Sequence, residues 1–238
     1  MKKIIRRSLI VLLISALLAG GFLALLRFRI IRINHPDGLK GVDVSSYQGK
    51  IDWHTLSEGL DFAFIKATEG SAHQDEMFSR NWEDSHKTGL FVGAYHFFSY
   101  DSPGTSQAEN FIATVGDQLP MLPPVIDVEL YDGYSDSPKA ADEVIPELEG
   151  MISALEEKYG AKPIIYCSRG TKKLYGKAFE DCPVWIRSVY FPPFGVEWSF
   201  WQYCDSEKRK GYKGEEPCID MNVFKGSRSD LSKMLINK

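Results

Sequence analysis

The chain has 238 residues, 44% hydrophobic and 25% charged, a composition typical of a globular protein and not of a disordered or collagen-like one. Seven of its 28 Lys and Arg residues precede the first acidic residue, Asp37, which leaves 21 basic groups against 32 acidic ones in the remainder. This acidic body argues against nucleic acid as a partner.

The N-terminal segment is typical of a membrane helix. Leu9 to Leu26 is a run of 18 uncharged residues, near the lower limit for a helix that crosses a bilayer. The run is longer than the apolar region of most signal peptides, and no A-x-A cleavage pattern follows it. We therefore expect residues 1–34 to form a short cytoplasmic stub and an uncleaved anchor, and residues 35–238 to form one domain. The alternative is that the N-terminal segment is cleaved and the domain is secreted.

After Gly38, short β-branched apolar runs alternate with helical patterns, which predicts βα units around a parallel sheet. Helical spacing is clearest in residues 76–88, 105–115 and 146–159, the last with Pro146 in its first turn. The predicted strands are residues 41–45, 62–67, 91–97, 124–128, 163–167, 184–188, 200–204 and 220–224. Eight strands and about five helices predict an α/β fold, a TIM-like (β/α) barrel whose final part is mostly strand.

Four cysteines lie in the last third of the chain, and none has the C-x-x-C spacing that is typical of a zinc site. Their number predicts structural pairing in an oxidising compartment. Of the three possible connectivities we expect Cys204 with Cys218, because both flank a polar connection between two strands, and by elimination Cys167 with Cys182. The alternative is that some of them are buried free thiols.

Four acidic residues mark the predicted strand ends, where the chemistry of a β/α barrel is concentrated. They are Asp43, Asp127, Glu129 and Asp220. Asp127 and Glu129 are two positions apart on a strand, so both point to one face with Cα atoms about 6.6 Å apart. Two carboxylates in one cleft raise the pKa of one of them, which then acts as a general acid, as in glycosidases. The alternative for any single one is a loop cap or a solvated side chain.

Aromatic side chains lie near the same strand ends, and flat rings suit the apolar faces of sugars. We name Tyr47, Tyr95, Trp185 and Trp201 as substrate-binding candidates, although such residues also fill barrel cores. His96 is a further candidate, as a binding residue or as a hydrogen-bonded buried histidine. No second His lies at metal-ligand spacing from it, and no phosphate- or dinucleotide-binding motif occurs, so we expect neither a metal nor a cofactor.

A series of short motifs runs from about Gly41 to Phe224. In chain order they are Gly41-Val42-Asp43-Val44-Ser45-Ser46-Tyr47-Gln48-Gly49, Phe64-Ile65-Lys66-Ala67-Thr68-Glu69-Gly70, Gly93-Ala94-Tyr95-His96-Phe97, Asp127-Val128-Glu129, Val184-Trp185-Ile186, Phe200-Trp201-Gln202-Tyr203 and Asp220-Met221-Asn222-Val223-Phe224. Together they resemble glycoside hydrolase family 25, the Chalaropsis-type lysozymes. One departure is Arg187-Ser188 after Trp185-Ile186, where many members have Ala-Arg.

The resemblance implies an N-acetylmuramidase on a flattened barrel that needs no metal or organic cofactor. It implies that Glu129 is the general acid and that Asp127 orients the substrate's 2-acetamido group, which attacks the anomeric carbon so that configuration is retained. Asp43 and Asp220 would bind the sugar and tune the pair, while Tyr95, Trp185 and Trp201 would line the groove. The partners implied are peptidoglycan glycan strands and, through the N-terminal helix, a membrane with the domain on its extracytoplasmic side.

Two other functions remain compatible with the residues. One is a cell-wall-binding module without turnover, against which the intact pair of Asp127 and Glu129 argues. The other is a glycosidase for a different N-acetylhexosamine polymer such as chitin, which would use the same kind of pair.

Overall fold

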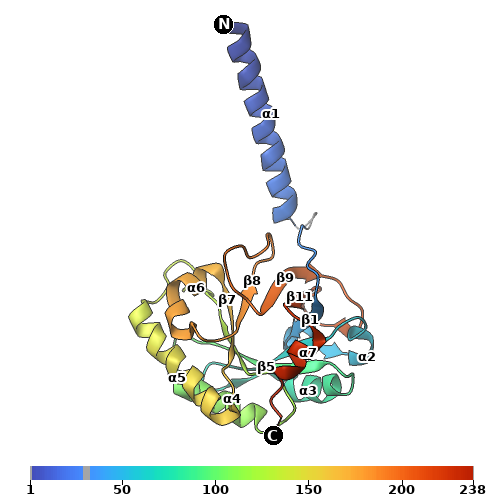
Figure 1. The fold of residues 1–238 in the computed structure, drawn as a ribbon, viewed down its shortest axis with the longest axis vertical. Helices are drawn as coiled ribbons and strands as arrows, with labels where there is room; N and C mark the ends of the chain where they lie inside the picture. The colour runs from blue at the N-terminus through green and yellow to red at the C-terminus, as the bar shows by residue number, and fades with distance from the viewer. Residues whose placement is uncertain (1, 29–32, 238) are drawn as a thin grey trace.

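In the computed structural model, which describes residues 2–28 and 33–237, eight strands close into a barrel that follows one long N-terminal helix (Figure 1). The barrel strands are β1 (Leu39–Val44), β3 (Phe62–Glu69), β5 (Phe91–Phe97), β6 (Val125–Val128), β7 (Ile164–Ser168), β8 (Val184–Arg187), β9 (Phe200–Glu207) and β11 (Ile219–Phe224). Two short strands, β2 (Lys50–Ile51) and β10 (Tyr212–Lys213), pair with each other, and β4 (His73–Gln74) pairs antiparallel with the end of β3. The predicted barrel is confirmed.

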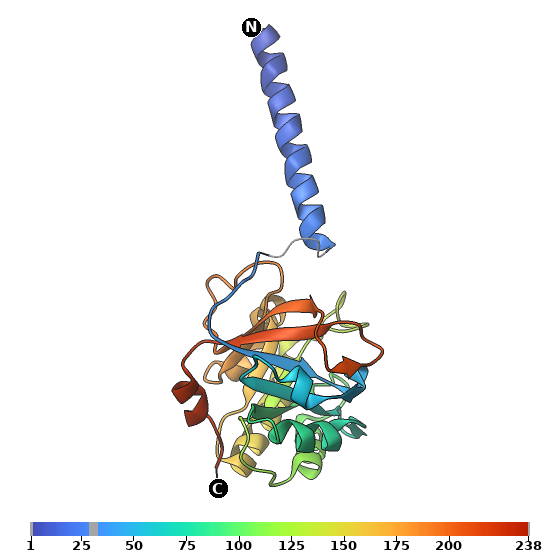
Figure 2. The same cartoon turned by 90° about the vertical axis from the view of Figure 1, so that its right-hand side faces the viewer.

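The strand order around the barrel is β1, β11, β9, β8, β7, β6, β5 and β3, and the pairing of β3 with β1 closes the ring. All these pairings are parallel except the two made by β11, which is antiparallel to both β1 and β9. The first residues of β11 therefore lie at the same end of the barrel as the last residues of the other seven strands. This end is at the right in Figure 2, next to β2 and β10.

Helices follow the first five barrel strands in the chain (β1, β3, β5, β6 and β7), and a further helix follows β11. They are α2 (Trp53–Leu56), α3 (Phe78–His86), α4 (Gly104–Val115), α5 (Ala141–Tyr159), α6 (Arg169–Tyr175) and α7 (Arg228–Lys233), with 3-10 turns η1 (Ser46–Gln48) and η2 (Gly176–Phe179). Between β8 and β11 the structure contains no helix among the described residues, as predicted. Helix α5 begins five residues earlier than expected, so Pro146 lies in its interior and not in its first turn; Asp142 and Glu143 occupy that turn, where acidic side chains favour the helix dipole.

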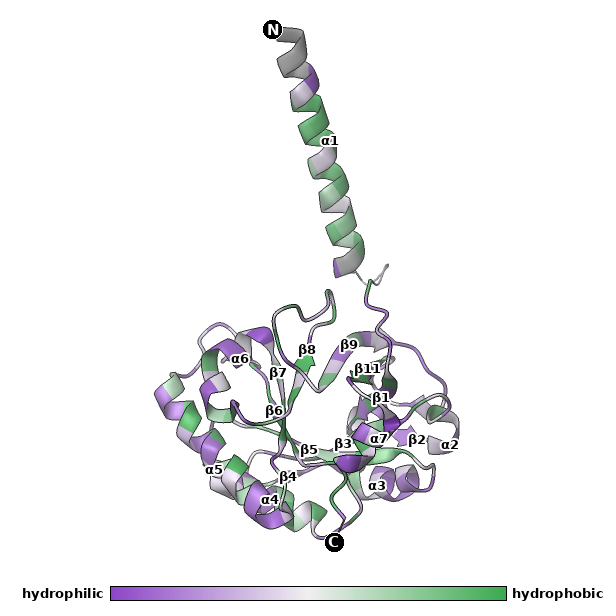
Figure 3. Cartoon of the chain, viewed as in Figure 1, coloured by the Kyte–Doolittle hydropathy of each residue, from purple (hydrophilic) through white to green (hydrophobic). Residues whose placement is uncertain are grey.

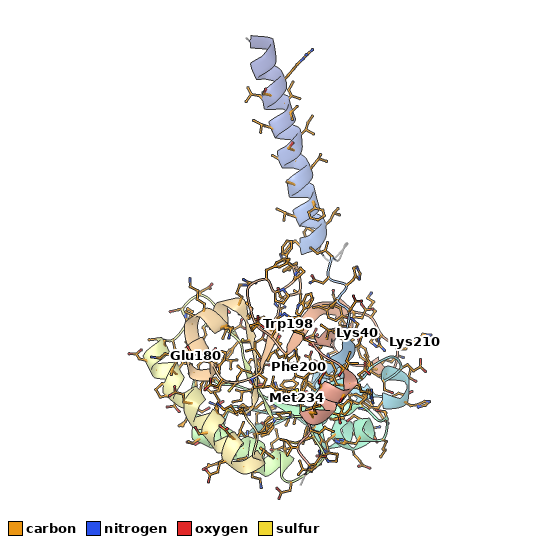
Figure 4. All side chains as sticks on the ribbon, viewed as in Figure 1. Lys40, Glu180, Trp198, Phe200, Lys210 and Met234 are labelled. Carbon is orange, nitrogen blue, oxygen red and sulfur yellow. The ribbon has the colours of Figure 1, made fainter. Side chains whose placement is uncertain are left out.

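The core has two parts, one on each side of the barrel wall. Outward-facing side chains of the strands pack against the helices. A second, largely aromatic cluster fills the barrel interior at the end where the parallel strands begin. The inner cluster includes Phe62, Phe64, Phe200 and Phe224, all of which are buried. Figure 4 shows Phe200 near the centre of the ring of strands.

Helix α1 (Lys2–Arg27) stands apart from the barrel and is almost entirely hydrophobic between its ends (Figure 3). Residues Arg7–Leu25 are long and apolar enough to cross a membrane, with a mean hydropathy of 2.5. Such a helix is consistent with a membrane anchor and with a signal sequence, since both meet the same criteria of length and composition.

The predicted disulfides are wrong, because all four cysteines are free thiols. Cys204 lies opposite Met221 in the β9–β11 pair, three residues beyond Cys218, an offset of about 10 Å along a strand. Cys167 lies opposite Ile186, four residues beyond Cys182. Both offsets exceed the Cα separation of about 4.4–6.8 Å that a disulfide requires.

Candidate functional site

A pocket of about 190 Å³ opens at the end of the barrel where the parallel strands finish. Its lining includes the four predicted carboxylates, Asp43, Asp127, Glu129 and Asp220, and three of the predicted aromatic residues, Tyr47, Tyr95 and Trp185. A larger surface hollow beside α2 and β10 contains none of these carboxylates. The structure therefore gathers most of the predicted site residues in one place.

Asp220 reaches this pocket from the beginning of its strand and not from the end. It is the second residue of β11, and its Cα is paired directly with that of Asp43, near the end of β1. The antiparallel direction of β11 thus brings two carboxylates from opposite ends of the sequence into adjacent positions, where they repel each other if both are ionised.

Two amide side chains hold these carboxylates. Asn222 Nδ2 donates a hydrogen bond to Asp43 Oδ2 (2.6 Å). Gln202 Nε2 donates to Asp43 Oδ2 (3.2 Å) and to Asp220 Oδ2 (3.0 Å), and so bridges the two acids. Because hydrogen bonds to a carboxylate favour its charged form, they offset part of the cost of burying the pair.

The orientation of both amides is fixed by donors behind them. Trp185 Nε1 donates to Asn222 Oδ1 (2.8 Å), and the Tyr166 hydroxyl donates to Gln202 Oε1 (2.8 Å). Since indole is a donor only, Asn222 must direct its carbonyl at Trp185 and its NH2 group at Asp43. The site is therefore preorganised by a chain of contacts that begins in the aromatic layer below it.

Tyr166, Gln202 and Asn222 were not among the residues predicted from the sequence. A signal for two of them was present, because Gln202 and Asn222 interrupt otherwise apolar strands and share a strand face with Phe200 and Asp220 respectively. Tyr166 has no comparable signal, since a tyrosine in a buried strand is ordinarily a core residue.

Asp127 and Glu129 form the second carboxylate pair, at the end of β6 and just beyond it. Burial, reinforced by Glu129 and then by Asp43, raises the pKa of Asp127 well above its usual value, and Asp127 Oδ1 has no hydrogen-bond partner among the residues that the structure describes. Burial also raises the pKa of Glu129, while the positive charge of Arg187 acts in the opposite direction. A group in this pair that keeps its proton near neutral pH is suited to general acid catalysis.

Burial raises the pKa of the other two acids as well, to about 6 for Asp43 and about 9 for Asp220. For Asp220 the next cause is the adjacent Asp43. Lys66 and Arg187 supply positive charge at the edge of the group: Lys66 lines the pocket and bonds Glu69 (2.7 Å), and Arg187 forms an ion pair with Asp205 (2.9 Å).

Two predicted binding residues, His96 and Trp201, do not lie in the pocket. His96 is fully buried between Thr68 Oγ1 (2.7 Å) and Gln107 Oε1 (3.0 Å), and burial lowers its pKa to about 4. Trp201 points outward from β9 and donates its Nε1–H to the Ser188 carbonyl (2.9 Å). Successive residues of a strand point to opposite faces, so the neighbours Tyr95 and Gln202 face the pocket instead.

Among residues 2–28 and 33–237, no group of three His, Cys, Asp or Glu side chains has an arrangement that would hold a metal ion. Two of the pocket carboxylates, Asp43 and Asp220, are instead engaged by neutral amide donors. The donors and the raised pKa values suit proton transfer and sugar hydroxyl binding.

Comparison with known proteins identifies the family. The sequence model described as "Glycosyl hydrolases family 25" matches residues 42–212. A solved family 25 glycosyl hydrolase from Bacillus anthracis is 47% identical, with a TM-score of 0.79 and coverage of 85% of this chain and 97% of that one.

Two relatives with names that state an activity agree. Lysozyme M1 of Streptomyces globisporus is 32% identical over 84% of this chain and 72% of its own length. N,O-diacetylmuramidase of Arthroderma benhamiae is 29% identical over 82% of this chain and 86% of its own. The family match, the shared barrel and the carboxylates at its mouth lead to one conclusion: this chain is a member of glycosyl hydrolases family 25.

Proposed function

We propose that this glycoside hydrolase is a muramidase, which cleaves the β-1,4 bond between N-acetylmuramic acid and N-acetylglucosamine in peptidoglycan. The observation that carries the proposal is the pocket with four carboxylates, one buried and three half-buried, on the fold of a family whose relatives include enzymes named lysozyme and muramidase. A cell-wall-binding module without turnover would have no use for carboxylates whose pKa values are raised by burial.

Glu129 is the general acid in this proposal. Its raised pKa keeps a proton available, and cleavage transfers this proton to the oxygen that leaves the anomeric carbon. The carbonyl oxygen of the substrate's 2-acetamido group forms a bond to the anomeric carbon as the glycosidic bond breaks. Water then opens that ring while Glu129, now ionised, accepts a proton, so the anomeric configuration is retained.

Asp127 positions the acetamido group. Its unpartnered Oδ1 is free to accept a hydrogen bond from the substrate amide N–H. Such a bond stabilises the ionised form of Asp127 and lowers its pKa. When the two neighbouring carboxyl groups hold one proton between them, that proton then lies on Glu129. Substrate binding thereby sets the protonation state that catalysis needs.

Asp43 and Asp220 bind sugar hydroxyls at the side of the pocket that Gln202 bridges. Tyr47, which is 54% exposed at the mouth, presents a ring for stacking on a sugar. Trp185 is only 2% exposed, so its role is to hold Asn222 and not to stack on the substrate.

We also propose that α1 remains in the membrane as an anchor and that the barrel lies on the extracytoplasmic side. Peptidoglycan is located there, and Arg7–Leu25 has the length and hydropathy of a single span. Cleavage of α1 as a signal sequence is the alternative.

The test is mass spectrometry of the fragments that the full-length protein, in detergent, releases from purified peptidoglycan. Glu129→Gln is the matched control, because it removes the proton and preserves the shape; we expect it to lower turnover by roughly 10²–10⁴-fold. Muropeptides with reducing muramic acid ends from the wild type alone would support the proposal. Near-normal release by the variant would refute the role of Glu129, and cleavage of chitin in place of peptidoglycan would identify the other polymer as the substrate.

A further inference from the structure

The connection from β8 to β9, which we call the 188–197 loop (Ser188–Glu197), exposes two large aromatic side chains. Phe191 is 48% exposed and Phe194 is 72% exposed. They account for half of the exposed large hydrophobic residues described after Asn34, the others being Tyr47 at the pocket and Leu174 on α6. Neither phenylalanine lines the catalytic pocket, so the proposed muramidase reaction does not explain their exposure.

The loop presents these rings from a fixed backbone. Ser188 Oγ donates a hydrogen bond to the Phe191 carbonyl (2.6 Å), and Phe194 N donates to the Pro192 carbonyl (2.9 Å). Arg169, at the start of α6, donates from Nη2 to the Phe194 carbonyl (2.6 Å). The exposed rings therefore stand on a braced turn, beside a guanidinium group.

The same loop lies where the chain from α1 joins the barrel. The buried side chain of Asn34 donates from Nδ2 to the Ser188 carbonyl (3.1 Å) and to the Tyr203 carbonyl (3.3 Å). Helix α1 ends at Arg27, seven residues before Asn34, so the connection spans at most about 25 Å. Figures 1 and 2 show the loop on the side of the barrel from which the chain leaves toward α1, and Figure 4 shows Trp198, just after the loop, on that side too.

Cationic residues accompany the loop. In the sequence, Arg27, Arg29 and Arg32 lie between the apolar run of α1 and Asn34 with no acidic residue among them, and the one acidic residue of the loop, the exposed Glu197, forms an ion pair with Lys225 (3.6 Å). Arg169 adds a cation directly beside Phe194. Exposed aromatic rings next to arginine are the combination that partitions into the headgroup region of anionic lipids, where the ring is buried and the cation meets phosphate.

We propose that the 188–197 loop docks on the anionic lipid surface of the membrane that holds α1, with Phe191 and Phe194 inserted among the headgroups. This inference rests on the membrane anchoring by α1 proposed above. The loop then gives the barrel a second contact with the bilayer, which fixes the direction of the pocket relative to the membrane and keeps it close to the innermost glycan strands.

The test uses the full chain in vesicles of phosphatidylcholine and phosphatidylglycerol. In a Cys218→Ser background, whose other cysteines are buried, single cysteines replace Phe194, Leu17 in α1 and Glu109 on α4, and each carries an environment-sensitive fluorophore. Glu109 is exposed on α4, which lies on the side of the barrel away from α1 in Figure 1, and is the matched control. We expect a blue shift and quenching by nitroxide-labelled lipid at positions 194 and 17, and neither at position 109.

The outcomes separate the two proposals. Quenching at position 17 alone would overturn docking and leave the anchor intact, whereas quenching at none of the three positions would overturn both. Equal quenching at 194 and 109 would also overturn docking, because it would show nonspecific adsorption. Phe191→Ser and Arg169→Gln should each reduce quenching at position 194 while leaving muramidase turnover of soluble glycan fragments unchanged, a separation that loss of folding would not produce.

Discussion

The two ends of the barrel interior are built by the same strands and differ in chemistry. Moving two residues along a strand changes the inward side chain from apolar to polar: Phe64 to Lys66 on β3, Val125 to Asp127 on β6, Ile164 to Tyr166 on β7, Phe200 to Gln202 on β9, and Phe224 to Asn222 on β11. The apolar layer packs ring against ring, as in Phe200 with Phe62 (5.3 Å) and with Phe224 (4.9 Å). The polar layer places four carboxylates together at the cost of stability.

This difference indicates that the two layers of one barrel have different roles. The apolar layer supplies stabilisation through burial and packing, whereas the polar layer contains groups that are costly to bury and useful in catalysis. Substitutions at the two layers should therefore affect different measurements, and three predictions test this; a fourth tests the state of the cysteines.

The largest effect is expected in the apolar layer. Phe200→Ala removes a fully buried ring and leaves a cavity, so the free energy of unfolding should fall by about 3–5 kcal/mol. Turnover per folded molecule should change little. Denaturant titration measures the first and peptidoglycan assays the second, with the exposed Phe191→Ala as a control that should cost less than about 0.5 kcal/mol. A loss below about 1 kcal/mol for Phe200→Ala would contradict the comparison.

The next effect is a gain of stability in the polar layer. The pKa of Asp220 rises from 3.8 to about 9, so the folded protein holds this proton more tightly than the unfolded chain. Its contribution is fully present below about pH 4 and is lost as the pH rises toward 9. Asp220→Asn should remove this loss, with stability above wild type by about 2 kcal/mol at mildly alkaline pH and unchanged near pH 4. Thermal melts across this range measure it; a variant less stable than wild type at alkaline pH would refute it.

A smaller effect links the two layers. Trp185→Phe keeps a ring on Phe64 but removes the donor to Asn222, and should cost about 1 kcal/mol of stability and several-fold in turnover. Trp201→Phe also removes one indole hydrogen bond, but on the outward face. It should cost similar stability and leave turnover nearly unchanged. Equal losses of turnover in both variants, measured by steady-state assay, would show that the network to Asn222 has no special role.

The smallest expected effect is none. Because the four cysteines are free, a reducing agent should leave the melting temperature unchanged. Burial raises the pKa of Cys167 to about 12 and of Cys182 to about 11, so a thiol reagent should modify the half-buried Cys218 first in the native protein. A lower melting temperature on reduction would show that a bridge exists after all.

The barrel, and the meeting of the four carboxylates at one end of it, could be predicted from the sequence because both leave local traces; the roles of the carboxylates stay predictions. Alternating strand and helix patterns identify βα units, and acidic residues after apolar runs mark strand ends. The family resemblance also held. The strand direction of β11 left no such trace, since the alternation of inward and outward residues is the same for both directions.

The errors at the site arose from strand faces and register. Tyr95 and His96 were both assigned to the site, although neighbours in a strand point to opposite faces, and Trp201 was assigned to it as an aromatic residue near a strand end. Polar Gln202 inside an apolar run was the better guide to which face lines the pocket. The cysteine pairs failed because connection length says nothing of the offset between paired strands.

The hydrogen bond from Asn222 to Asp43 joins residues 179 positions apart, and the bond from Gln202 to Asp43 joins residues 159 apart. The first strand is thus completed by the last, and no earlier portion of the chain can substitute for it. A polypeptide that stops before β11 contains Asp127 and Glu129 and yet lacks the partner that closes the ring. Synthesis order therefore matters: we expect a nascent chain to lack turnover until β11 is made, because Asp220 and the Asn222 amide that holds Asp43 both lie on that strand.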